Sequence, residues 1–349
     1  MRNYFPNLYE NRRTAAMLGA SIENNTLSHA LLIVGPSGSG KSTLAREVAM
    51  AVNCEKRHDG QYPLPCGFCN TCRRIREGNF TDIKYLEKPK DRATIGVEAV
   101  KDFREDMFLS ATESERKIYI IDSAHTMTPE AQNALLKVLE EPPTSVLIMI
   151  LSSEADRILT TVKSRAQLIT MKKISNDKLG EYLLSVSDEA RALSVSDRSA
   201  FDALILASDN VIGNAIRLTS KGDRDTILSK REITLGFLRA LCGRIEYSRL
   251  YRAVSDIPSK TRGELTEALE DIIKATRDLI VVRASAGKAR LLFFTAPTEA
   301  ESLSRQIGTK RLLALEEILN NAIRLNSMNA NIQSILANIS AELRLREKH

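Results

Sequence analysis

The sequence lacks any long apolar run. The longest apolar stretch, Val146 to Leu151, is far shorter than the ~20 residues of a membrane span. The N-terminus, Met1 to Pro6, also lacks the apolar core of a signal peptide. Repeats and low-complexity tracts are absent too. These absences argue against a membrane protein or a secreted one and predict a cytoplasmic protein.

A strong charge of one sign is also missing. Lys and Arg number 50 against 44 Asp and Glu, so the net charge is +6, which permits contact with nucleic acid without indicating it. Hydrophobic residues make up 43% and charged residues 27% of the 349 residues, as in soluble globular proteins. This length predicts two or three domains, each able to bury a core without disulfides.

The most specific motif follows the apolar run Ala30 to Val34. It is Gly35-Pro36-Ser37-Gly38-Ser39-Gly40-Lys41-Ser42, which fits G-x-x-x-x-G-K-[ST] without a mismatch, and a helix-forming segment, Thr43 to Val52, follows. Such a loop surrounds phosphates with backbone N–H groups at a helix N-terminus. Lys41 is expected to reach the β- and γ-phosphates, and Ser42 to ligate Mg²⁺. The motif therefore predicts that the chain binds ATP with Mg²⁺.

A second apolar strand, Lys117 to Ile121, ends in Asp122. An aspartate at this position of a phosphate-loop ATPase holds Mg²⁺, and we expect Asp122 to do so. The next residue is Ser123, and a serine does not accept a proton efficiently near neutral pH. Binding and hydrolysis of the nucleotide are therefore separate questions for this chain.

Four of the five cysteines cluster with the spacing C-x11-C-x2-C-x2-C, as Cys54, Cys66, Cys69 and Cys72. Four thiolates complete the tetrahedral shell of a structural Zn²⁺ and leave no open position for water. An iron–sulfur cluster is the competing interpretation. Cys242 stands alone in a helical segment, where a small core residue is expected.

Apolar strands alternate with helices from residue 31 to 171, which predicts a parallel, three-layer α/β sheet. We expect helices at Arg12 to Asn24, at about 96 to 110, and after Thr128-Pro129. Strands are expected at Asp82 to Leu86, Val146 to Leu151 and Ala166 to Met171. A helical block at 175–228 and a helical remainder at 229–349 complete the predicted organisation, with residues 1–174 as the core and 54–72 as its metal module.

Several of these motifs occur together in one order. The phosphate loop, the cysteine module, Ile121-Asp122, the segment Asn133 to Pro143 (NALLKVLEEPP) and Ser164-Arg165-Ala166-Gln167 resemble the bacterial clamp-loader ATPases of DNA polymerase III. The resemblance covers residues 1 to about 220. It implies an AAA+ P-loop core, a small helical lid and an all-α collar that assembles a pentamer. That pentamer places a sliding clamp on primed DNA.

The resemblance also implies roles for single residues. Arg165 would be an arginine finger that reaches the γ-phosphate held by an adjacent subunit. Ser152 or Ser153 would occupy the sensor-1 position and Arg217 the sensor-2 position in the lid. Leu8 and Tyr9 would border the adenine. Thr43 completes the nucleotide-binding set.

Two subunit types of this family share the plan, the gamma/tau motor and the delta-prime stator. Ser123, Ala166 after the finger, and the absence of tau's long extension favour a delta-prime-like subunit. Such a subunit would have weak ATPase activity of its own and would join gamma/tau and delta in a hetero-pentamer. The alternatives are a gamma/tau-type motor that hydrolyses ATP at its own site and a regulatory ATP-binding protein outside replication.

Overall fold

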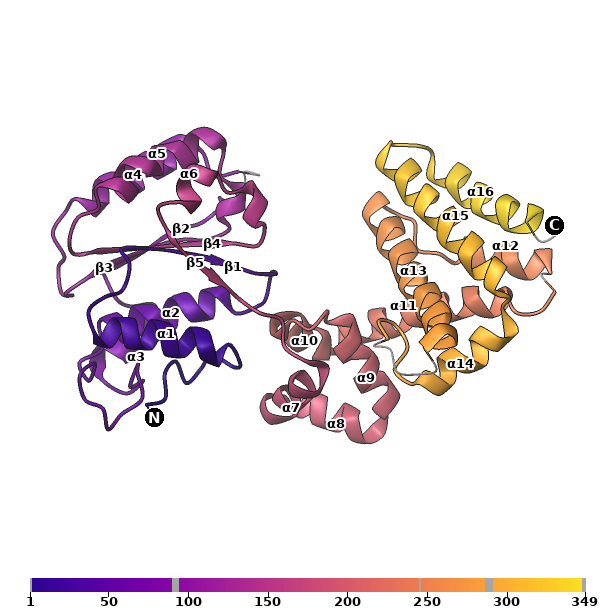
Figure 1. Ribbon diagram of the computed structural model, residues 1–349, viewed down its shortest axis with the longest axis horizontal. Coiled ribbons are helices and arrows are strands. Elements are labelled where there is room, and N and C mark those ends of the chain that lie inside the picture. The colour runs from indigo at the N-terminus through magenta and orange to yellow at the C-terminus, as the bar shows by residue number, and fades with distance from the viewer. Residues whose placement is uncertain (1, 90–93, 245, 286–290, 347–349) are drawn as a thin grey trace. The chain divides into compact units, whose positions relative to one another are not determined.

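A computed structural model of the chain describes residues 2–89, 94–244, 246–285 and 291–346. The chain divides into two compact units, Met1–Ser175 with Val211–Gly213, and Asn176–Asn210 with Asn214–His349. The first contains a sheet with helices on both faces, and the second is helical (Figure 1). No described helix is long and apolar enough to cross a membrane.

The first unit is built on five parallel strands in the order β2-β3-β4-β1-β5. They are β1 (Ala30–Val34), β2 (Ile83–Leu86), β3 (Lys117–Ile121), β4 (Val146–Ser152) and β5 (Gln167–Thr170). Val34 lies opposite both Ser152 and Thr170, so the carboxyl ends of these strands meet at one edge. The predicted parallel α/β sheet is confirmed, and that edge is where ligands of such sheets gather.

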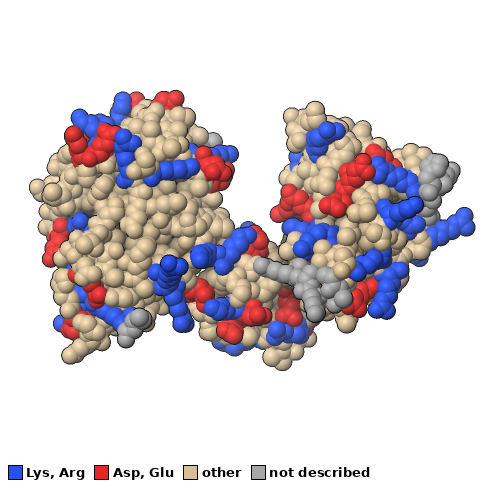
Figure 2. Space-filling model, viewed as in Figure 1, with Lys and Arg blue, Asp and Glu red and all other residues tan. Residues whose placement is uncertain are grey.

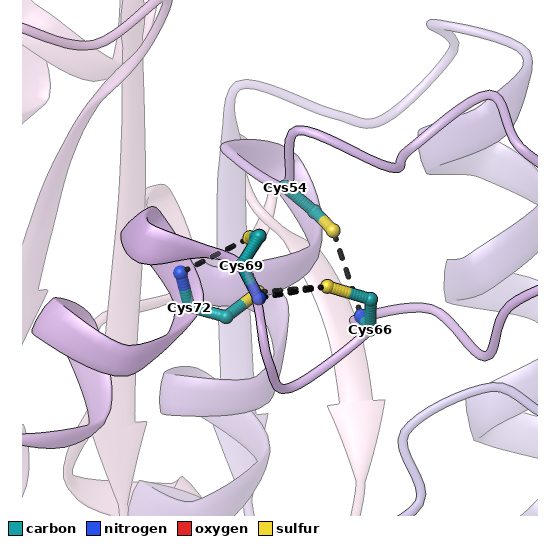
Figure 3. Close-up of side chains that lie close together, drawn as sticks. All are labelled: Cys54, Cys66, Cys69 and Cys72. Atoms are coloured by element: carbon teal, nitrogen blue, oxygen red, sulfur yellow. Dashed lines mark hydrogen bonds between the residues drawn. The ribbon is translucent and has the colours of Figure 1, made fainter.

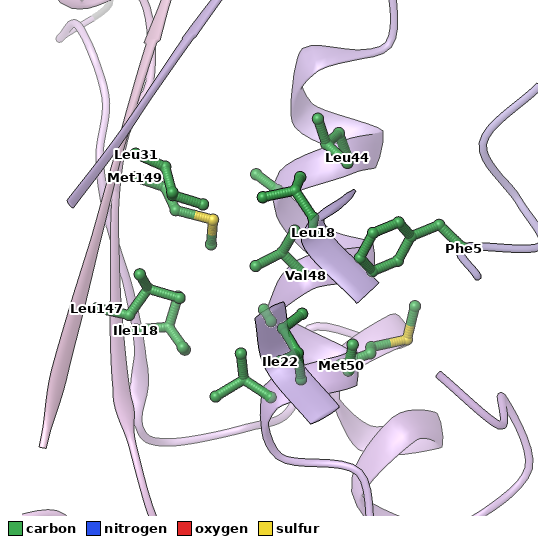
Figure 4. Close-up of a cluster of buried hydrophobic side chains, with 14 of the residues drawn as sticks. Phe5, Leu18, Ile22, Leu31, Leu44, Val48, Met50, Ile118, Leu147 and Met149 are labelled. Carbon is green, nitrogen blue, oxygen red and sulfur yellow. The ribbon is translucent and has the colours of Figure 1, made fainter. Parts of the chain in front are cut away.

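Two apolar cores enclose this sheet, because alternate residues of its central strands point to opposite faces. Leu31, Leu147 and Met149 face α1 and α2 (Figure 4). Leu32, Ile148 and Ile150 face the other core. The helices of the first face are α1 (Arg12–Glu23), α2 (Lys41–Val52) and α3 (Asn70–Arg76). Those of the second are α4 (Val97–Met107), α5 (Pro129–Glu140) and α6 (Thr160–Lys163). The predicted three layers are therefore present.

Two helix ends differ from their predicted positions. Helix α2 begins at Lys41, before the predicted Thr43, because Gly40 serves as its N-cap. Helix α4 ends at Met107 and not near Ser110. Its end is held by Lys117, whose buried Nζ donates to the carbonyls of Asp106 and Leu109 at 2.8 and 3.3 Å. A cation bonded to the last carbonyls stabilises a helix C-terminus.

The second unit contains only helices among its described residues. They are α7 (Asn176–Val186), α8 (Asp188–Ser196), α9 (Arg198–Ala207), α10 (Ile212–Thr219, which belongs to this unit from Asn214 on), α11 (Lys221–Ala240), α12 (Tyr247–Ser255), α13 (Arg262–Ser285), α14 (Pro297–Gln306), α15 (Thr309–Ser327) and α16 (Ile332–Leu345). Side-chain N-caps at Ser187, Asp197 and Asn331 fix three helix starts. The predicted division into a lid at 175–228 and a collar at 229–349 stays a prediction.

Candidate nucleotide-binding site

The phosphate loop leaves β1 and turns into α2. Gly38 and Gly40 have φ of 79° and 90°, a left-handed conformation that side chains disfavour. Lys41 Nζ donates to the carbonyls of Gly35 and Pro36 at 2.8 and 2.9 Å. Ser39 Oγ is buried and has no hydrogen-bond partner within the described residues. A turn with a buried cation and an orphaned hydroxyl fits the binding of an anion such as a phosphate.

Lys41 and Asp122 come together at the carboxyl edge of the sheet, where Asp122 directly follows β3. Burial lowers the pKa of Lys41, and the negative charge of Asp122 partly offsets that effect. The lysine is 9% exposed. A cation and a carboxylate placed in this way match the phosphate and Mg²⁺ roles that the motifs predict.

Ser123 has a left-handed backbone with φ 52° and ψ 42°. Its N–H donates to Asp122 Oδ1 at 2.6 Å, and its Oγ lies 3.5 Å from the same oxygen. The residue after the metal-binding aspartate therefore turns back onto that aspartate.

The two sensor-1 candidates have different surroundings. Ser152 is fully buried at the end of β4, and its Oγ donates to the carbonyl of Glu154 at 2.8 Å. Ser153 Oγ lies 3.1 Å from Nε2 of His125, which belongs to the short helix η1 (Ala124–Thr126). The sequence interpretation missed this link, since no spacing rule connects a residue after β3 with one after β4.

The N-terminal segment lies beside the loop. A leucine methyl of Leu8 is 4.0 Å from the point where a Cβ of Gly40 would stand. Tyr9, the next residue, is half-buried. Asn7 Nδ2 donates to Oε1 of the buried Glu47 on α2 at 2.7 Å, which ties this segment to the helix that carries Lys41. The segment with Leu8 and Tyr9, which is predicted to border the adenine, therefore lies next to the phosphate loop.

Gly213 also reaches the phosphate loop. Its N–H donates to the carbonyl of Gly38 at 3.0 Å, and a Cβ at Gly213 would stand 2.8 Å from Gly38 Cα. This close approach requires glycine. Arg217, the sensor-2 candidate, lies exposed in the last turn of α10 in the second unit.

Arg165 follows α6 and is partly exposed. Its Nη2 lies 2.7 Å from Oε1 of Glu140, and its Nη1 donates to the carbonyl of Thr161 and to Ser164 Oγ at 2.9 and 3.2 Å. These contacts come from the ends of α5 and α6. None of them belongs to the phosphate loop of the same chain.

The four clustered cysteines converge as predicted (Figure 3). All four are buried, and their sulfurs lie within 4.8 Å of one another. Backbone N–H groups of Cys66, Cys69 and Cys72 donate to cysteine sulfurs at 3.4 to 3.5 Å. A hydrogen bond from Cys72 lowers the pKa of the Cys54 thiol to about 5. Four close donors, one of them readily ionised, suit a single tetrahedral ion such as Zn²⁺.

Sequence comparisons find relatives among the subunits of one polymerase. Residues 10–175 match the family described as DNA polymerase III, delta subunit. The tau subunit of DNA polymerase III from Bacillus subtilis is 29% identical over 306 residues, which are 84% of this chain and 53% of that protein. The gamma/tau subunit of Mycoplasma pneumoniae is 30% identical over 194 residues, 56% of this chain and 27% of that protein. The chain thus spans about half, or less, of the length of these curated relatives.

A solved structure of a gamma subunit-related protein from Thermotoga maritima covers 95% of this chain and 98% of its own, at 18% identity and a TM-score of 0.43. The matched residues 10–175 include the phosphate loop, Asp122, the four cysteines and Arg165. Their parallel sheet with a phosphate loop after β1 is the expected AAA+ core. Residues 10–175 are thus similar to the delta-subunit family of DNA polymerase III, and gamma/tau subunits of that polymerase are among the relatives of the chain.

Proposed function

We propose that the chain is a delta-prime-like clamp-loader subunit that binds ATP, hydrolyses it poorly and supplies Arg165 to the nucleotide of a neighbouring subunit. The observation that carries this proposal is a complete phosphate loop combined with Ser123 beside Asp122. Ser123 directs its N–H to Asp122 Oδ1 at 2.6 Å and offers only a hydroxyl. A hydroxyl does not act as a general base at neutral pH, so this site would hold a triphosphate without activating water.

The cofactors in this proposal are ATP, Mg²⁺ and a structural Zn²⁺. Lys41 and the loop N–H groups would bind the phosphates, while Ser42 and Asp122 would hold Mg²⁺, which neutralises phosphate charge. Leu8 and Tyr9 would border the adenine. The four thiolates would hold Zn²⁺ with no open position, so this metal would stabilise the fold and take no part in catalysis.

The partners in this proposal are gamma/tau and delta subunits in a hetero-pentamer, the sliding clamp, and primed DNA reached through the complex, all in the cytoplasm. On the face drawn in Figure 2, acidic and basic side chains are interspersed. Mixed charge of this kind gives weak attraction for a DNA backbone. This supports DNA contact through the assembly more than through this chain alone.

The alternative is a gamma/tau-type motor that hydrolyses ATP at its own site. His125 favours this alternative. It lies on η1, which follows Asp122 in the chain, and its Nε2 is hydrogen-bonded to Ser153 Oγ just after β4. An imidazole can accept a proton at neutral pH. Measured turnover by the isolated chain separates the two functions.

Substituting Arg165 tests the finger directly. In the reconstituted loader, Arg165→Ala is expected to slow ATP hydrolysis at one subunit interface by up to ~10³-fold, since arginine fingers contribute ~10³–10⁵ in rate. Single-turnover hydrolysis measures this loss, and the chain's own nucleotide affinity should stay unchanged. Arg157→Ala is the matched control, because Arg157 is also an exposed arginine paired with a glutamate, Glu154, at 2.9 Å. Unchanged hydrolysis with Arg165→Ala would remove the assignment.

A further inference from the structure

Glu140 is the charged neighbour of Arg165. Its Oε1 lies 2.7 Å from Arg165 Nη2, and the two side chains are 50% and 35% exposed. Glu140 ends α5, and Arg165 stands two residues after α6 ends at Lys163. The pair therefore connects two elements that both belong to the wall of one apolar core.

The position of Glu140 is unfavourable for a carboxylate by itself. The last turn of a helix carries negative partial charge, which favours cations and disfavours anions. The guanidinium of Arg165 offsets this charge. It is also fixed at its other nitrogen by the carbonyl of Thr161 and by Ser164 Oγ. Oxygen atoms from the ends of two helices thus contact one planar group, which limits its rotation.

The same contacts leave Arg165 able to bind another anion. A guanidinium has five N–H donors. Hydrogen bonds to Thr161 and Ser164 use those of Nη1, whereas Nη2 contacts Glu140 as an ion pair at 2.7 Å. Within the described residues, the N–H groups of Nε and Nη2 make no hydrogen bond. The ion pair with Glu140 therefore leaves N–H groups of the guanidinium available to a phosphate oxygen.

We propose that Glu140 is a positioning residue for Arg165, which fixes the guanidinium so that its remaining N–H groups face the γ-phosphate bound by a neighbouring subunit. The inference rests on the proposed finger role of Arg165 and names the group that orients it. Val138 and Leu139, which precede Glu140, are buried, so the carboxylate projects from a rigid support. A catalytic group gains from such support because small misplacements lower the rate strongly.

The test uses the complete reconstituted loader with Glu140→Gln, which keeps the size of the side chain and removes its charge. We expect kcat for ATP hydrolysis to fall about tenfold with KM unchanged, since misplacing a catalytic group costs up to ~10² in rate. Glu141→Gln is the matched control. Its exposed side chain makes no hydrogen bond or ion pair within the described residues, so wild-type kcat is expected.

A double-mutant comparison separates positioning from a general structural effect. In an Arg165→Ala background, Glu140→Gln should cause no further loss, because the group that it orients is gone. A further loss in that background, unchanged kcat in the single variant, or a rise in kcat would each overturn the positioning role. An Arg165→Ala variant with wild-type hydrolysis would instead overturn the proposed finger, so the two failures are distinguishable.

Discussion

Helix α2 joins two sites that are built in opposite ways. It begins at Lys41 of the phosphate loop and ends at Val52, two residues before Cys54 of the cysteine cluster. In the cluster, four buried thiols converge within 4.8 Å, so one chain provides the four donors that a tetrahedral ion would need. In the loop, Lys41 bonds to the loop's own carbonyls, and Ser39 Oγ has no hydrogen-bond partner within the described residues.

This difference indicates a structural role for the cysteine cluster and a ligand-binding role for the phosphate loop. A site whose donors are all supplied and buried in one chain stabilises the fold and has no position for a substrate. A site that keeps donors for an exchangeable anion depends on its ligand. The comparison predicts that damage to the cluster affects stability, whereas damage to the loop affects binding.

The largest expected effect follows from breaking the cluster. Cys72→Ser should lower the free energy of unfolding by several kcal/mol, because binding of a structural Zn²⁺ contributes ~10–16 kcal/mol even in zinc-finger peptides. Thermal melting measures the loss, and metal analysis should find about one zinc per wild-type chain. The matched control is Cys242→Ser, which changes a lone, half-buried cysteine on the second unit. Iron with visible absorbance, or equal melting of the two variants, would contradict this interpretation.

The smallest expected effect concerns Glu47, on the helix between the two sites. Its Oε2 is buried without a partner within the described residues, and burial raises the pKa of this carboxyl. Glu47→Gln keeps an oxygen for Asn7 and removes a buried charge. We expect a gain of about 1 kcal/mol in the free energy of unfolding at pH 8, because a neutral amide costs less to bury than a charge.

The pH dependence of that gain follows from the direction of the pKa shift. A glutamate whose pKa is raised by folding is mostly protonated at about pH 4 in both states, because even its ordinary pKa is about 4.3, so the variant should then nearly match the wild type. As the pH rises through the raised pKa, the buried group ionises and destabilises only the wild type. Melting curves at pH 4 and pH 8 check this, and a gain that is equal at both pH values would contradict it.

The sequence predicted the parts of the molecule that local rules determine. The phosphate loop needs one contiguous motif, and short spacings brought the four cysteines into one module. Buried apolar runs such as Ala30 to Val34 predicted the parallel sheet. The confirmed fold and cysteine cluster depend on these local signals.

The contacts that the sequence did not predict join distant segments. Asp82 accepts hydrogen bonds from the N–H groups of Thr112, Glu113 and Ser114, and Asp278 does the same for residues 292–294. Each buried aspartate holds a loop, yet no spacing rule connects it with its donors. The pairing of Glu140 with Arg165 is missed for the same reason, since the fold alone brings α5 and α6 together.

One measurement tests the proposed function most directly: binding and turnover of MgATP by the isolated chain, with and without DNA. We predict that the wild-type chain binds MgATP clearly and shows negligible turnover. Lys41→Ala should lower the affinity for MgATP about ten- to a hundredfold, since a charged hydrogen bond is worth ~1.5–3 kcal/mol. DNA-stimulated hydrolysis that disappears with Lys41→Ala would contradict the account and establish a motor.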